Sequence, residues 1–328
     1  MTGLSRRTLV LGAAMTPLAA YAQPPVPGWP APGTIIKVIV PFPPGGSVDA
    51  IARLLVPGLQ QRLGATVIVD NRTGASGSIG TDMVAKSKPD GMTWLFIFDN
   101  LVLNPFVLPK LPFDTEKDLA PAYLLGKAPY IVCTNPQKPY KTLADVIRIA
   151  KEQPGKISFG TPGSGSLGHL AMMLLAKEAG IQIVHIPYRG AAPALNDAIA
   201  GQIDLFVGSV AIATPQIEGG KVRAIVQLGE KRASAMSNVP TARESGFPNV
   251  IADAWWGFFA PAGTPDAVIQ RFNAAVAEVL REPIVAKQVT ESQQVTLVNG
   301  GPEELRKFVR DQMTLWGPVA KENHIVAD

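Results

Sequence analysis

The chain has 328 residues, of which 47% are hydrophobic and 17% are charged, and its formal net charge is +4 at pH 7. These proportions are typical of a globular protein and exclude an intrinsically disordered chain. Arg6 and Arg7 are the only charged residues before Gln23, so removing that segment lowers the charge from +4 to +2. Such a near-balance gives no electrostatic basis for binding nucleic acid. The single cysteine, Cys133, excludes an internal disulfide, and its apolar neighbours favour a buried hydrophobic side chain over a reactive thiol.

The first 22 residues have the pattern of a cleaved export signal. Ser5-Arg6-Arg7 precedes an apolar run from Leu9 to Ala20, and Ala20-Tyr21-Ala22 is an A-x-A cleavage site. The apolar run is shorter than the roughly 20 residues that span a bilayer, so we expect cleavage after Ala22 and a periplasmic protein. The adjacent arginines favour the twin-arginine route over general export. Residues 23–33 are rich in Pro and Gly and are predicted to form an extended, mobile leader.

From Thr34 onward, short apolar runs alternate with segments of helical spacing, a pattern typical of βαβ units. The first group predicts strands at 35–40, 67–69 and 93–98 with helices at 47–63 and 79–86. The second predicts helices at 143–151, 167–179 and 193–200 with strands at 157–159, 183–186 and 205–207. The remainder predicts a strand at 222–227, an apolar stretch at 255–260, and helices at 266–280 and 302–320.

This order of elements predicts an α/β protein with two lobes, each a doubly wound sheet flanked by helices. A chain of roughly 300 residues commonly divides into two domains. Because the last helices are expected to return to the first lobe, lobe 1 comprises 34–127 and 254–328, and lobe 2 comprises 128–253. Two chain crossings, near Lys127 and Asp253, would then form a hinge.

Two segments, Val38 to Ser47 and Ile157 to Ser166, share one design in which a strand runs into a glycine turn that opens a helix. Glycine lets the backbone approach a ligand closely, and the first amides of a helix favour an anion. Ligands of open α/β sheets bind beyond the carboxyl ends of the strands. One such turn per lobe predicts a clamp in which backbone amides hold a carboxylate. Ser47 and Ser166 are also expected to cap their helices, and Asp49 to satisfy free amides rather than contact the anion.

The segment Gly163 to Gly168 also matches the dinucleotide pattern G-x-G-x-x-G. The following strand, 183–186, does not end in the acidic residue that would bind the ribose of NAD. It continues into Pro187-Tyr188-Arg189, and Arg189 could bind the additional phosphate of NADP. An exported NADP-dependent oxidoreductase is therefore the enzymatic alternative, and a surface adhesion or scaffold protein is a third class.

The other polar residues match no catalytic or metal-binding motif. His169, His185 and His324 lack the spacing of metal ligands, and no nucleophile elbow is present. His169 follows the second glycine turn, so it either faces the cleft or packs against the fold. Asp204 begins a strand, where it either contacts a cationic or hydroxyl group of the ligand or has a structural role. The aromatic run from Trp255 to Phe259 favours packing in the core or hinge over stacking on a ligand.

These motifs together closely resemble the tripartite tricarboxylate transporter substrate-binding proteins, also called the Bug family. The resemblance spans nearly the whole chain after the leader. Its segments are Val40 to Gly46, Asp70 to Ala75, Pro89 to Gly91, Phe159 to Gly163, Ile186 to Gly190, Gly201 to Asp204, Val239 to Thr241 and Trp256 to Pro265.

The resemblance implies a non-enzymatic periplasmic protein with a two-lobe Venus-flytrap fold of type II. Such a protein is a monomer that binds a small carboxylate, such as a di- or tricarboxylate, an amino acid or an aromatic acid. It delivers the ligand to membrane transporter subunits in a transient contact, with ligand sensing as an alternative, and needs no cofactor, metal or nucleic acid. The expected ligand-binding residues are Phe42, Pro44, Gly45, Gly46, Ser47, Ala75, Asn100, Thr161, Gly163, Ser164, Gly165, Ser166, His169, Tyr188 and Asp204.

The sequence departs from the family pattern at two places. Asp70 stands where the family commonly has glutamate, and Phe98-Asp99-Asn100 is unusually acidic for a segment that often borders the pocket. If Asp99 faces the cleft, a ligand with an amino group or another hydrogen-bond donor is favoured.

Overall fold

The computed structural model describes residues 28–327, so the predicted export signal and residues 23–27 of the leader lie outside the described residues. The rest of the leader is in contact with the fold. The Trp29 indole Nε1 donates to the carbonyl of Asp90 at 3.0 Å, and its ring lies edge-on to Trp94 with centroids 6.3 Å apart. Residues 28–33 are therefore anchored to lobe 1, where the sequence predicted a mobile segment.

Lobe 1 is built on a mixed sheet with the strand order β2-β1-β3-β9-β4. The first three strands are parallel, β9 is antiparallel to β3 and to β4, and β10 pairs with β4 on a separate branch. The strands are β1 (Ile35–Val40), β2 (Thr66–Asn71), β3 (Thr93–Ile97), β4 (Leu119–Thr134), β9 (Asp253–Pro261) and β10 (Thr296–Gly300). The helices of this lobe are α1 (Ser47–Leu63), α2 (Ser78–Ala85), α3 (Asn100–Val107), α8 (Asp266–Leu280), α9 (Pro283–Lys287) and α10 (Pro302–Glu322).

Lobe 2 uses the far end of β4, which pairs there with β7 and β8, and continues through β5 to β6. Its strands are β5 (Ser158–Thr161), β6 (Val184–Pro187), β7 (Leu205–Ser209) and β8 (Arg223–Gln227). The helices are α4 (Leu143–Glu152), α5 (Leu167–Ala179), α6 (Ala191–Ile199) and α7 (Val210–Glu218). Strands β5, β6 and β7 are mutually parallel, so their carboxyl ends lie at one edge of the sheet.

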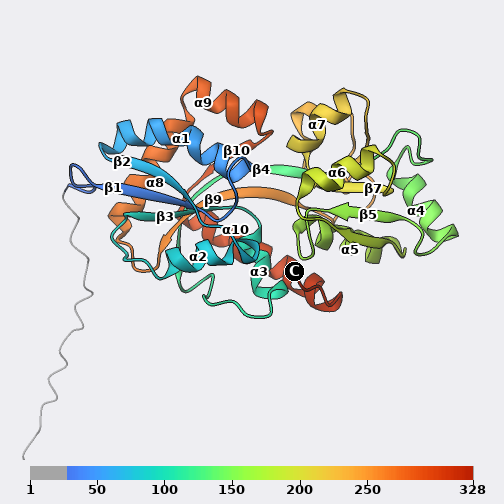
Figure 1. The fold of residues 1–328 in the computed structure, drawn as a ribbon, viewed down its shortest axis with the longest axis horizontal. Helices are drawn as coiled ribbons and strands as arrows, with labels where there is room; N and C mark the ends of the chain where they lie inside the picture. The colour runs from blue at the N-terminus through green and yellow to red at the C-terminus, as the bar shows by residue number, and fades with distance from the viewer. Residues whose placement is uncertain (1–27, 328) are drawn as a thin grey trace, which may run out of the picture.

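Two long strands connect the lobes, as Figure 1 shows where β4 and β9 run from one half of the molecule to the other. They pair antiparallel from Leu119 opposite Pro261 to Pro129 opposite Asp253. The chain passes from one half to the other along these two paired strands, which is the arrangement of a hinge. The residue boundaries expected for the lobes remain a prediction.

Apolar residues fill both lobes and the connecting strands. In lobe 1 the Trp94 ring stacks on Phe272, with centroids 3.7 Å apart and an interplanar angle of 9°. Trp255 and Trp256 are both fully buried, and Cys133 is a buried free cysteine, as the apolar runs around them predicted. Helices α1, α5 and α8 have the predicted bounds. Helices α3 and α7 were missed by the sequence analysis; they have only 8 and 9 residues, too few to establish a helical period in the sequence.

Candidate ligand-binding site

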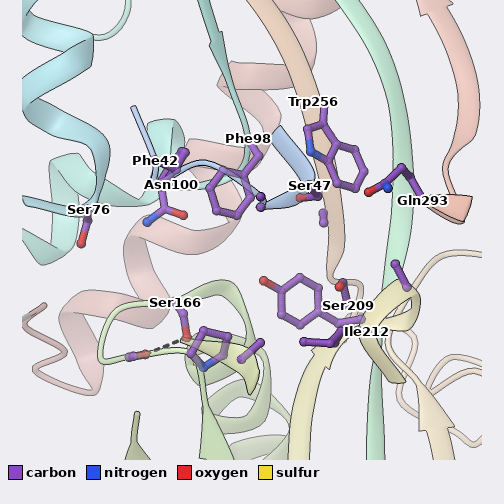
Figure 2. Close-up of a pocket in the computed structure, with 18 of the residues that line it drawn as sticks. Phe42, Ser47, Ser76, Phe98, Asn100, Ser166, Ser209, Ile212, Trp256 and Gln293 are labelled. Carbon is purple, nitrogen blue, oxygen red and sulfur yellow. Dashed lines mark hydrogen bonds between the residues drawn. The ribbon is translucent and has the colours of Figure 1, made fainter. Parts of the chain in front are cut away.

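A cavity of about 610 Å³ opens between the two lobes, where the carboxyl ends of β1, β5 and β7 converge. Its volume is in the range of small-molecule sites. Figure 2 shows side chains of both lobes directed into one shared space. None of the described lining residues is an Asp, Glu, Lys, Arg or His. They are Phe42, Gly45, Gly46, Ser47, Ser76, Phe98, Asn100, Tyr130, Pro162, Gly163, Ser164, Ser166, Ala191, Ser209, Ala211, Ile212, Ala254, Trp256, Ser292 and Gln293.

The first glycine turn brings the amino terminus of α1 to the cavity. Gly45 has a φ of 88°, a left-handed conformation that favours glycine. Gly46 is the N-cap residue in extended conformation, and no side chain caps this helix end. Ser47 is the first helical residue, so the prediction that its side chain caps the helix was wrong. The free amides of α1 are therefore available to a ligand.

Asp49 supports this turn from behind the cavity wall. Its Oδ2 accepts the backbone N–H of Gly45 at 3.0 Å, and the Arg53 guanidinium bonds both carboxylate oxygens at 3.0 Å. The Asn71 side-chain NH2 donates to Asp49 Oδ1 at 2.9 Å and to the backbone carbonyl of Phe42 at 3.0 Å. Burial raises the pKa of Asp49, but the bonds from Arg53, Gly45 and Asn71 outweigh it and hold the pKa below its ordinary value. This confirms the prediction that Asp49 satisfies an amide of the turn.

The second glycine turn places the amino terminus of α5 against the same cavity. Ser166 occupies the N-cap position, but its side chain accepts no cap hydrogen bond. Instead its hydroxyl donates to the carbonyl of Gly163 at 2.7 Å, so the predicted side-chain cap was wrong here as well. Thr161 donates to the same carbonyl at 3.0 Å. Gly165 has a φ of 73°, and a Cβ there would lie 3.0 Å from Val107 of α3.

Two histidines support the second turn. His169 Nδ1 accepts the backbone N–H of Gly165 at 3.3 Å, and its ring stacks on His185 with centroids 3.6 Å apart. His185 Nε2 lies 2.7 Å from the Thr161 hydroxyl. Burial, and secondarily the neighbouring His185, lowers the pKa of His169 to about 3. His169 is therefore neutral near pH 7 and acts on the turn rather than on the ligand.

Four aromatic side chains, Phe42, Phe98, Tyr130 and Trp256, form part of the cavity wall. Phe42 and Phe98 meet edge to face with centroids 4.6 Å apart. Figure 2 shows Trp256 reaching the space from β9, near Gln293, with Ser209 and Ile212 on the side of lobe 2. Such walls complement the apolar part of a small organic ligand, and the scattered hydroxyl and amide groups complement its polar parts.

Eight of the predicted site residues line the cavity, and seven do not. Phe42, Gly45, Gly46, Ser47, Asn100, Gly163, Ser164 and Ser166 line it, whereas Pro44, Ala75, Thr161, Gly165, His169, Tyr188 and Asp204 are absent from its lining. Thr161, Gly165 and His169 shape the second turn from behind. The Tyr188 hydroxyl donates to Asp197 at 2.7 Å, and Ala75 adjoins the lining residue Ser76.

Asp204 precedes β7, at the edge of the sheet opposite the cavity, so the structure supports its structural alternative. Its carboxylate accepts the Ser158 N–H at 2.9 Å and pairs with Lys138 at 2.9 Å. The Tyr140 hydroxyl lies 3.2 Å away. Burial raises the pKa of Asp204, but the hydrogen bonds from Ser158 and Lys138 outweigh burial, so the pKa of Asp204 lies below its ordinary value.

The sequence analysis missed several lining residues. Ser209 could have been found, because it ends β7 at the same sheet edge as the glycine turns. Tyr130 and Trp256 are spaced like core residues along connecting strands. Ser292 ends a short π-helix, Gln288–Ser292, and Gln293 follows it; no sequence pattern marks either residue.

Residues 51–325 match the family model described as tripartite tricarboxylate transporter family receptor. The chain is similar to protein BugT of Bordetella pertussis, with 35% identity over 293 residues that cover 89% of this chain and 90% of BugT. It is similar to the solved structure of Rhodopseudomonas palustris Rpa4515 with adipate, with a TM-score of 0.80, 29% identity and coverage of 91% and 99%. MatC from the same organism, with bound malate, has a TM-score of 0.76, 29% identity and coverage of 89% and 99%.

These similarities confirm the predicted two-lobe binding-protein fold and the prediction of a solute-binding receptor rather than an enzyme. Within residues 28–327, no helix is both long and apolar enough to cross a membrane. The same residues contain no cluster of three or more His, Cys, Asp or Glu side chains suited to a metal ion.

Proposed function

Because this chain belongs to the tripartite tricarboxylate transporter receptor family, we propose that it captures one small carboxylate in the cavity between its lobes and delivers it to the membrane components of a transporter. The observation on which this depends is the convergence of two glycine turns, each opening a helix, on one cavity without charged lining residues. A carboxylate there would accept charge-assisted hydrogen bonds from both lobes.

The binding mechanism follows from the helix ends. The amino termini of α1 and α5 carry partial positive charge and unsatisfied N–H groups. A carboxylate that contacts both termini favours the closed arrangement of the lobes over an open one, since only closure brings both donors to it. Strands β4 and β9 would bend as the hinge. Closure would in turn present a ligand-dependent surface to the transporter.

The ligand class follows from the rest of the cavity. Adipate and malate occupy two structural relatives, and a cavity of about 610 Å³ accommodates either. Aromatic walls favour an apolar spacer or ring beyond the carboxylate, and Ser209, Ser292 and Gln293 offer partners for a further polar group. We therefore include dicarboxylates, amino acids and aromatic acids in the proposal. The periplasmic location, the cleaved signal and the monomeric state belong to the same proposal.

A thermal-shift screen of the purified protein tests this function. Malate, adipate, citrate, glutamate and benzoate are compared at equal concentration, with NADP as the probe for the oxidoreductase alternative. Binding to the folded state at a hundredfold excess over Kd adds about 2.7 kcal/mol of stability, so a true ligand raises Tm by several degrees. Stabilisation by NADP alone, or by none of the carboxylates, would contradict the proposal.

A further inference from the structure

Asp99 lies directly behind the cavity wall, at the start of α3, and is 1% exposed. Its carboxyl group is hydrogen-bonded to the backbone N–H of Asn100 and to the hydroxyl of Tyr130. Asn100 and Tyr130 both line the cavity. Among the described residues, Asp99 Oδ2 has no hydrogen-bond partner. A buried carboxyl with an unsatisfied oxygen is costly to keep, so its position beside the cavity suggests a functional role.

The contact between Asp99 and Tyr130 fixes the direction of a hydrogen bond. A phenol has one proton to donate and can accept through its oxygen. An ionised carboxylate has no proton, so the Tyr130 hydroxyl must donate to Asp99. The phenol oxygen is then left as an acceptor toward the cavity. A protonated Asp99 can instead donate to the phenol, and the phenol proton becomes available to a ligand.

We propose that Asp99 acts through Tyr130 as a specificity-determining residue, so that the site prefers carboxylates that also carry a hydrogen-bond donor, such as a hydroxyl or amino group. This inference rests on the proposed carboxylate-binding function and names the second group that the ligand must present. Asp99 does not contact the ligand. The phenol oxygen of Tyr130 accepts the hydrogen bond from the ligand's donor group. The glycine turns bind the carboxylate of the ligand, and Tyr130 recognises a different group of the same ligand.

The preference depends on pH because Asp99 titrates near neutrality. Burial raises the pKa of Asp99 to about 7, against smaller lowering effects of the Asn100 N–H and the Tyr130 hydroxyl. Tyr130 is itself the titratable group that faces Asp99, and burial, then the charge of Asp99, raises its pKa well above the ordinary value. Tyr130 therefore stays protonated throughout, and Asp99 alone changes state. Donor-bearing ligands are favoured above pH 7, and the preference weakens below it.

Matched ligand pairs test this inference by calorimetric titration at pH 8 and pH 6. The pairs are malate with succinate, glutamate with glutarate, and 4-hydroxybenzoate with benzoate, each differing in one donor group. At pH 8 we expect at least one pair to show a preference of about tenfold for the donor-bearing member, the size of one good hydrogen bond. The ratio should fall at pH 6, and in Asp99→Asn, whose side chain cannot ionise, it should be the same at both pH values.

Two further variants separate this role from a structural one. Tyr130→Phe should abolish the preference even where Asp99 is intact. Asp253→Asn removes a partly buried carboxyl, whose pKa burial raises to about 6 and which is absent from the cavity lining, so it should keep the wild-type ratio and its pH dependence. A ratio that still falls at pH 6 in Asp99→Asn, or no discrimination by the wild type in any pair, would overturn this inference while carboxylate binding itself survives. Failure of every carboxylate to bind would overturn the proposed function.

Discussion

The carboxylate of Asp49 accepts the backbone N–H of Gly45 at 3.0 Å, so the first glycine turn is held by a side chain of the helix that it opens. The same carboxylate is bonded to Arg53 and Asn71. The position of the turn is therefore set before any ligand arrives, which reduces the entropy that binding must overcome.

Replacing Asp49 with Asn should loosen this turn. We expect the free energy of unfolding to fall by about 1–3 kcal/mol, since bonds to a charged acceptor are lost, and ligand affinity to fall about tenfold. The folded-state pKa of Asp49 is lowered, so its stabilising contribution is present above pH 3.8 and is lost as the pH falls through the folded-state value. Chemical denaturation and calorimetry measure both effects. Asp311→Asn, which removes an exposed partner of Lys307, should change neither quantity.

A bulky residue at Gly46 should block the anion site without disturbing the fold. Gly46 has an ordinary extended conformation, and a Cβ there would meet nothing closer than the Pro43 carbonyl at 3.8 Å. We expect Gly46→Val to weaken carboxylate binding about tenfold to a hundredfold, since a charge-assisted bond contributes about 1.5–3 kcal/mol. Gly301 is also an extended N-cap glycine with open space around it, so Gly301→Val is a matched control. Equal affinities of the two variants would remove the first turn from the site.

His169 should make the protein sensitive to acid. Its folded-state pKa is lowered to about 3 by burial and by His185, whereas the unfolded side chain protonates near the ordinary histidine pKa of 6.5. The unfolded state therefore binds more protons between these values, and stability decreases as the pH falls below 6.5, by up to about 1.4 kcal/mol per pH unit. His169→Gln should flatten this part of the profile, measured as Tm from pH 4 to pH 8. Retention of the full slope of Tm against pH in His169→Gln would contradict this expectation. The control His324→Gln should keep the slope of the wild type.

Asp204→Asn should destabilise lobe 2 and leave binding unaffected. The substitution removes the charge that pairs with Lys138 and weakens the bonds to Ser158, which we expect to cost about 2–4 kcal/mol of unfolding free energy. Because Asp204 lies at the sheet edge away from the cavity, carboxylate affinity should stay within about twofold of the wild type. A large loss of affinity in a variant that is still folded would return Asp204 to the list of ligand-binding residues.

Local sequence patterns determined much of this protein. The bounds of α1, α5 and α8 and the positions of both glycine turns follow from periodicity and turn residues, because these depend on neighbours a few positions apart. The exclusion of Asp204 could also have been inferred, since the first residue of a parallel strand lies at the sheet edge opposite the ligand.

Only the tertiary structure decided which distant residues complete the site. Tyr130, Trp256 and Gln293 come from the two connecting strands and a segment near the carboxyl terminus, and nothing in their local sequence distinguishes a cavity wall from a core. The sequence places Asp99 beside the pocket as a possible ligand contact. In the structure its burial and its hydrogen bond to Tyr130 give it an indirect role. The reason is physical: the order of strands in the sheets and the approach of the two lobes bring these residues together, and neither is encoded by local spacing.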